Sequence, residues 1–100
     1  MDQPEFDASA RATLDRLAER IEAALDDADV EFREGVLTVE LADGRTYVVN
    51  RHAPNRQIWL SSPVSGAHHF DPAPGGGWVS SRGGATLEAL LAAELGLAPG

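Results

Sequence analysis

The sequence predicts an α+β fold: a two-layer α–β sandwich with two terminal helices packed on one face of an antiparallel meander sheet. A segment at each end of the chain repeats apolar residues every three or four positions, which predicts the helices. Between them, short segments alternate apolar and polar residues and are separated by turns rich in glycine and proline, as in consecutive strands. Because helices and strands are segregated, we expect both helices on one sheet face and solvent on the other. We expect residues 1–100 to form one domain, since their number suits one small core.

The first helix is expected from about Gln3 to Ala28. Asp2 and Glu5 have the spacing of a capping box, and Pro4 suits the first helical turn. The apolar face that should bury against the sheet consists of Phe6, Ala10, Leu14, Leu17, Ile21, Leu25 and Ala28.

The middle of the chain predicts short strands joined by tight turns. They are expected at Val30–Arg33, Val36–Leu41, Thr46–Arg51, Gln57–Ser61, His68–Asp71 and Trp78–Ser80. Asp43-Gly44 is a strong hairpin signal, because both residue types tolerate the positive φ angles of a two-residue turn. On the last strand, Trp78 is expected to belong to the core.

The second helix is expected to begin after Thr86, whose side chain can cap it. Its apolar residues are Leu87, Leu90, Leu91 and Leu95. Gly96 should end the helix, and Pro99 should prevent its extension.

Composition restricts the classes of function. The formal net charge of −8 argues against nucleic acid and anionic membranes as partners. The chain has no cysteine, so it can provide neither disulfides nor thiolate ligands nor a thiol nucleophile. No apolar run approaches the roughly 18 residues of a membrane-spanning helix, and the acidic N-terminal segment lacks the features of a targeting peptide. We therefore expect a cytoplasmic, monomeric protein.

Several motifs together resemble the frataxin family, in its bacterial, CyaY-type form. They are the run YVVNRHAPNRQIWLSSPVSG at Tyr47–Gly66, the pair Phe70-Asp71, Trp78, and the closing LEALLAAELG at Leu87–Gly96. The resemblance covers nearly the whole chain. It implies the α–β sandwich and a role in iron–sulfur cluster assembly, through iron binding and docking to a cysteine desulfurase and a cluster scaffold.

Acidic residues gather at the end of the first helix and the start of the first strand. We call this set the acidic ridge and take its members as candidate metal ligands: Glu19, Glu22, Asp26, Asp27, Asp29 and Glu31. Like charges four residues apart cost roughly 0.2–0.5 kcal/mol per pair, and acids at a helix C-terminus oppose its dipole. Several unfavourably placed acids in one region suggest a functional role. Frataxins also carry acidic residues at the corresponding helix end and first strand. The alternative is a merely solvated acidic face.

Carboxylates suit hard cations, such as Fe²⁺, Fe³⁺ and other hard divalent ions. No spacing of acids and histidines forms a closed cage, so we expect weak, exposed binding completed by water. The ridge could equally dock a basic patch of a partner.

The strand at Gln57–Ser61 poses a separate question, because Trp59 shares a strand face with Gln57 and Ser61, opposite Ile58 and Leu60. We expect Trp59 on the open sheet face as an interface anchor; the alternative is that a loop or chance packing covers it. The resemblance implies a scaffold-binding surface of Asn50, Gln57, Trp59 and Ser61, with Arg51 and Arg56 as flanking charge. Many mitochondrial members carry a basic residue where His69 stands. His52, His68 and His69 are expected to be ordinary strand and loop residues.

We expect an iron-binding regulator or adaptor of iron–sulfur cluster assembly rather than an enzyme. One alternative is ferroxidase or iron-storage activity at the ridge, although no paired E-x-x-H motifs of a di-iron site are present. The other is an acidic protein-interaction module without a metal role.

Overall fold

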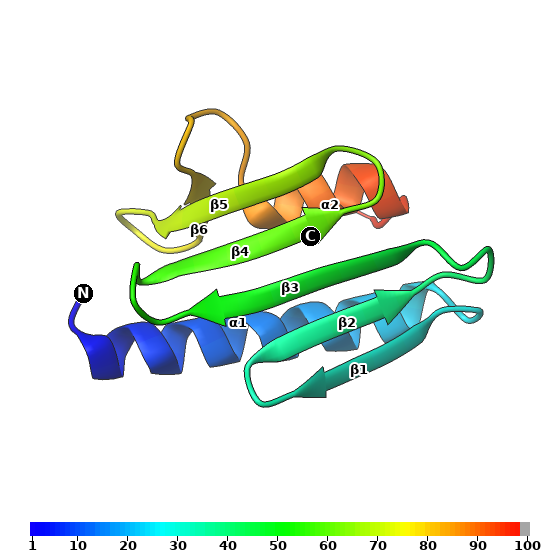
Figure 1. Cartoon of the computed structure of the whole chain (residues 1–100), viewed down its shortest axis with the longest axis horizontal. Helices are drawn as coiled ribbons and strands as arrows, with labels where there is room; N and C mark the ends of the chain where they lie inside the picture. The colour runs from blue at the N-terminus through cyan, green and yellow to red at the C-terminus, as the bar shows by residue number, and fades with distance from the viewer. Residues whose placement is uncertain (99–100) are drawn as a thin grey trace.

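The computed structural model describes residues 1–98. The elements follow in the order α1 (Gln3–Ala24), β1 (Asp29–Arg33), β2 (Val36–Glu40), β3 (Thr46–His52), β4 (Gln57–Ser62), β5 (Gly66–Pro72), β6 (Trp78–Ser80) and α2 (Leu87–Leu95) (Figure 1). Pro99, expected to prevent extension of the second helix, lies outside the described residues. Within residues 1–98, no helix is both long and apolar enough to cross a membrane.

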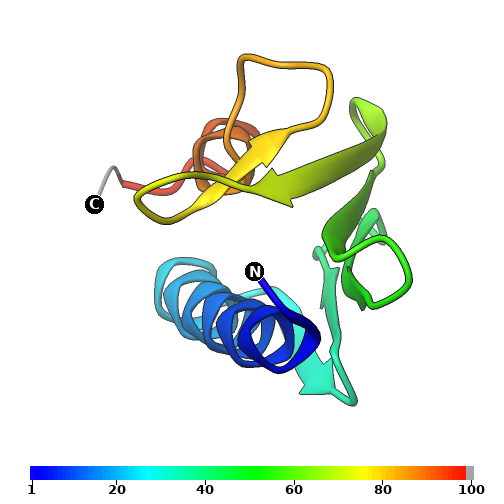
Figure 2. The same cartoon turned by 90° about the vertical axis from the view of Figure 1, so that its left-hand side faces the viewer.

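The described strands form one antiparallel meander in the spatial order β1-β2-β3-β4-β5-β6. Both helices lie on the same side of this curved sheet (Figure 2). The predicted fold class, an α+β two-layer sandwich, is confirmed.

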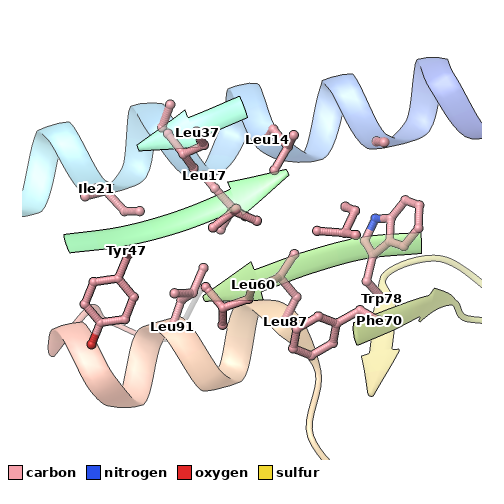
Figure 3. Close-up of a cluster of buried hydrophobic side chains, with 14 of the residues drawn as sticks. Leu14, Leu17, Ile21, Leu37, Tyr47, Leu60, Phe70, Trp78, Leu87 and Leu91 are labelled. Atoms are coloured by element: carbon pink, nitrogen blue, oxygen red, sulfur yellow. The ribbon is translucent and has the colours of Figure 1, made fainter. Parts of the chain in front are cut away.

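The core fills the space between the helices and the inner sheet face (Figure 3). Along β2 and β4 every second side chain is buried, and on β3 the alternate residues Tyr47 and Val49 are buried, as the period of a strand requires. The largest fully buried residues include Phe6, Leu14, Leu17, Ile21, Leu37, Tyr47, Ile58, Leu60, Phe70, Leu87 and Leu91.

Helix ends follow the capping residues with one exception. The Asp2 carboxylate accepts a hydrogen bond from the Glu5 amide, and Thr86 caps α2 in the same way. However, α1 ends at Ala24, not at Ala28 as predicted, and Leu25 has extended φ and ψ angles of −120° and 94°. The last turn of α1 has no basic residue, and the acids that follow oppose the helix dipole, so continuation is unfavourable.

Trp78 connects the two layers from the edge of the sheet. Its side chain is only 2% exposed, which confirms the predicted core position. The indole Nε1 donates to Thr13 Oγ1 at 2.9 Å, and the ring meets Phe6 edge-on at a centroid distance of 5.8 Å. The bond satisfies a buried donor that would otherwise cost about 1–3 kcal/mol.

Glu94 attaches α2 to the sheet through hydroxyl groups. Its carboxylate accepts hydrogen bonds from Tyr47 Oη at 2.9 Å, Ser62 Oγ at 2.6 Å and Ser65 Oγ. Partial burial opposes ionisation of the Glu94 carboxyl, but these three donors outweigh it and lower the pKa of Glu94. Burial, reinforced by the Glu94 carboxylate, raises the pKa of Tyr47.

We predict that Glu94→Gln destabilises the protein by roughly 1 kcal/mol at pH 7, because the hydroxyls lose a charged acceptor. The folded pKa of Glu94 lies below its ordinary value of 4.5, so the unfolded chain binds more protons between the two values. Stability from Glu94 is therefore complete above about pH 4.5 and is lost as the pH falls through the folded pKa. Urea unfolding at pH 7 and at acidic pH should show a smaller acid-induced loss in the variant.

Glu88→Gln on the same helix is the matched control, because its carboxylate pairs with Arg16 at the exposed surface. We expect the control to change stability by less than about 1 kcal/mol. An equal acid-induced loss in the parent and in Glu94→Gln would contradict the prediction.

Candidate iron ridge and docking face

The acidic ridge follows the chain from the end of α1 into the sheet. Glu19 and Glu22 lie on α1, Asp26 and Asp27 in the turn, and Asp29 and Glu31 on β1; all six are exposed. Along β1, exposed and half-buried residues alternate, so Asp29 and Glu31 lie on the outer sheet face. Asp26 and Asp27 also border a shallow hollow of about 400 Å³ between the end of α1 and the start of the β2–β3 turn.

The ridge has the right donors for a hard cation but no prebuilt cage. Among residues 1–98, no group of three or more histidines, aspartates or glutamates could hold a metal ion together. Carboxylate oxygens nevertheless fit iron chemically, with water in the remaining positions. This arrangement can support weak and exposed binding, as the sequence predicts.

Trp59 lies on the sheet face that the helices leave open. It pairs with Asn50 on β3 and with His69 on β5, near the middle of the outer face. The indole Nε1 donates to Gln57 Oε1 at 2.9 Å, and Gln57 Nε2 donates to Asp71 Oδ1 at 2.9 Å. Asn50, Gln57, Trp59 and Ser61 thus share this face, which we call the docking face.

Trp59 is half-buried because two imidazole rings cover it, not because a loop does. The His52 ring stacks on the indole with centroids 3.5 Å apart, and the His69 ring stacks at 4.2 Å; the interplanar angles are 9° and 12°. Both histidines were expected to be ordinary strand and loop residues. The two-residue period of a strand could have placed His52 on the face of Trp59, because His52 and Asn50 are two residues apart and therefore share a face.

Arg51 and Arg56 lie toward α1 and not beside Trp59. Arg51 follows Asn50 in the strand and so points to the opposite face, where it pairs with Asp7 at 3.3 Å. Gly35 (φ 78°) makes room there, since a Cβ on it would lie 3.3 Å from Arg51 Nε. Arg56, at φ 50° in the β3–β4 turn, donates to Gln3 Oε1 at 3.3 Å. Partner binding by these two arginines stays a prediction.

His68 and His69 point to opposite faces, as expected for neighbours in a strand. His68 Nε2 lies 2.8 Å from Ser65 Oγ, close to the Glu94 network, whereas His69 stacks on Trp59. The two rings therefore cannot chelate one ion together.

The chain matches one known family over nearly its whole length. A family model described as a frataxin-like domain matches residues 1–99. The chain belongs to the frataxin family. Mitochondrial frataxin of Arabidopsis thaliana is 40% identical over 101 residues, which cover 95% of this chain and 54% of that protein.

Two solved structures show the same fold. Frataxin from Psychromonas ingrahamii, of the CyaY protein family, superposes with a TM-score of 0.84 at 28% identity, covering 95% of this chain and 89% of that one. A trimeric frataxin from Saccharomyces cerevisiae, complexed with ferrous iron, gives a TM-score of 0.71 at 42% identity, covering 96% and 84%.

The comparisons correct one expectation, since the prediction of a cytoplasmic location is wrong. The frataxins from Arabidopsis thaliana, Caenorhabditis elegans and Saccharomyces cerevisiae, to which the chain is similar, all carry mitochondrial names. The prediction rested on the acidic start of this sequence. The chain spans only about half the length of several curated relatives, with 54% and 47% of the Arabidopsis and yeast proteins covered, so its start is a poor guide to location.

We predict that changing Asp26, Asp27 and Asp29 together to asparagine raises the melting temperature. These acids follow the C-terminal end of α1, where each carboxylate costs roughly 0.3–1 kcal/mol, and they also repel one another. A calorimetric melt at low ionic strength measures the effect, which salt should reduce.

Asp43→Asn is the control for loss of an acid. The Asp43 carboxylate accepts hydrogen bonds from the backbone amide and Nε of Arg45, which lower the pKa of Asp43. Its replacement should not raise the melting temperature. A lower melting temperature in the triple variant would mean that the ridge acids stabilise the fold.

Proposed function

We propose that this frataxin-family protein is an iron-binding adaptor of iron–sulfur cluster assembly. In this proposal the acidic ridge holds Fe²⁺ or Fe³⁺ weakly, and the docking face contacts the cluster scaffold, with a cysteine desulfurase as the second partner. The observation that carries the proposal is the presence of two separate surfaces on one frataxin-type domain: exposed carboxylates around the end of α1, and an open sheet face centred on Trp59. The yeast relative complexed with ferrous iron supports the metal role.

The chemistry of the ridge favours binding over catalysis. Exposed carboxylates at high dielectric attract a cation only weakly, and water can exchange freely around it. A ferroxidase would need a defined site that holds iron and oxygen together. We therefore propose that the protein is not an enzyme, and oxygen consumption on addition of Fe²⁺ would favour the ferroxidase alternative.

We also propose the bacterial, CyaY-type assignment within the family, supported by the TM-score of 0.84 to the Psychromonas protein. A monomeric state stays part of the proposal, although the yeast relative was solved as a trimer.

We predict that anaerobic Fe²⁺ broadens the amide signals of Glu19 through Glu31 in the ¹⁵N-labelled protein at near-equimolar metal. Paramagnetic iron broadens signals close to it, so a local effect would map the metal surface. The triple variant of Asp26, Asp27 and Asp29 should lose most of the effect.

The matched control changes Asp2, Glu5 and Glu88 to their amides, which removes the same charge at the first turns of α1 and α2, away from the ridge. It should keep the broadening. An equal loss of broadening in both variants would mean that iron is attracted only by the net negative charge of the protein. No broadening in the parent protein would favour the acidic interaction module.

We predict that Trp59→Ala leaves the fold nearly intact but weakens binding to the scaffold by about 2 kcal/mol, or roughly 30-fold. The indole is an anchor of large apolar area on an otherwise polar face. Titration calorimetry measures the affinity, and a thermal melt checks the fold. Val64→Ala is the control, because Val64 is 60% exposed in the β4–β5 turn and outside the docking face. Unfolding of Trp59→Ala would identify Trp59 as core, and unchanged affinity would exclude it as an anchor.

A further inference from the structure

The stack His52–Trp59–His69 contains an unusual buried atom. Within residues 1–98, His52 Nδ1 is the one buried side-chain nitrogen or oxygen without a hydrogen-bond partner. The ring that carries it lies flat against the indole of Trp59 at a centroid distance of 3.5 Å. His69, on the other side of the indole, is exposed. The two clamping rings therefore differ in their access to water.

This difference matters because imidazole takes up a proton within the physiological range. A neutral ring can leave a lone pair on Nδ1 and carry its proton on the other nitrogen. A charged ring is a donor at both nitrogens, so His52 Nδ1 would become a buried N–H without an acceptor. The exposed His69 ring can gain the same charge while it remains on the indole, where a cation is attracted to the ring face.

No charged group around the stack bonds to His52 Nδ1. Glu34, in the β1–β2 turn, lines the hollow beside α1 together with Arg51. Asp71 on β5 accepts from Gln57, while Arg51 and Arg56 at the end of β3 and in the turn bond to Asp7 and Gln3 on the other side. The remaining charged residue in the row of Asn50, Trp59 and His69 is Arg33 on β1, aligned through Val36. A proton on His52 Nδ1 would therefore lack an acceptor for as long as the ring and the bond between Gln57 and Asp71 keep their positions.

We propose that His52 is a pH-sensitive clamp on the docking face: protonation releases its ring from Trp59 and uncovers one face of the indole, while His69 stays stacked. Uncovering the indole removes a contact that fixes its orientation, so scaffold binding weakens on acidification. The effect on binding rests on the proposed docking role of this face, but the release of the ring does not.

The test uses nuclear Overhauser contacts between aromatic protons in the free protein, from about pH 8 to pH 5, the range in which histidine titrates. We expect the contacts between His52 and Trp59 to be lost as His52 gains its proton, and those between His69 and Trp59 to persist. The Trp59 indole N–H signal, assigned from Trp59→Phe, should shift over the same range. His52→Gln should remove the part of that shift caused by His52, and the part that remains should disappear in His69→Gln, because His69 also stacks on the indole.

His68→Gln is the matched control, because His68 bonds to Ser65 on the helix side of the sheet. This variant should leave the pH dependence of the Trp59 indole N–H signal unchanged. The proposal would be overturned if the contacts between a protonated His52 and Trp59 persisted. It would also be overturned if the pH dependence of the Trp59 indole N–H signal were the same in His52→Gln as in the parent protein. These measurements need no partner. Failure of the scaffold to bind at any pH would therefore refute the docking role while the release of His52 is judged independently.

Discussion

The structure depends on one constraint: a single face of the antiparallel sheet is buried, and both helices are used to bury it. Strand residues alternate between faces, so every apolar side chain directed at the helices has a neighbour directed at solvent. Tyr47, Val49, Ile58 and Leu60 fill the inner face. No helix remains for the outer face within residues 1–98, and Trp59 consequently lies on an open surface.

The two proposed functional surfaces differ in how their side chains are held in position. The docking face is built on β3, β4 and β5, which pair over most of their lengths, and its central indole is fixed by a hydrogen bond and two ring stacks. Side chains on paired strands keep their positions better than side chains on loops. The ridge instead spans a helix end, a turn and an edge strand, where charged groups stay hydrated. Such a surface suits a ligand that is bound weakly and passed on.

Polar contacts join the layers at the periphery of the core. Trp78 bonds to Thr13, Glu94 holds α2 against β3 and β4, and Arg51 and Arg56 join the β3–β4 region to the start of α1. Each links residues far apart in the sequence. They fix how the helices sit on the sheet and leave the docking face free of the two arginines.

The sequence by itself determined the elements, the helix caps, the outward direction of Trp59 and the family, because these follow from local spacing and from motifs. It also located the acids of the ridge, though not their metal role. The end of α1 at Ala24 was missed, since the apolar period continues to Ala28 while the acids after Ala24 disfavour continuation of the helix. Only the tertiary structure decided the Glu94 network, the direction of Arg51 and Arg56, and the ring stack on Trp59. These contacts depend on strand register and on side chains from distant segments, which local periodicity does not encode.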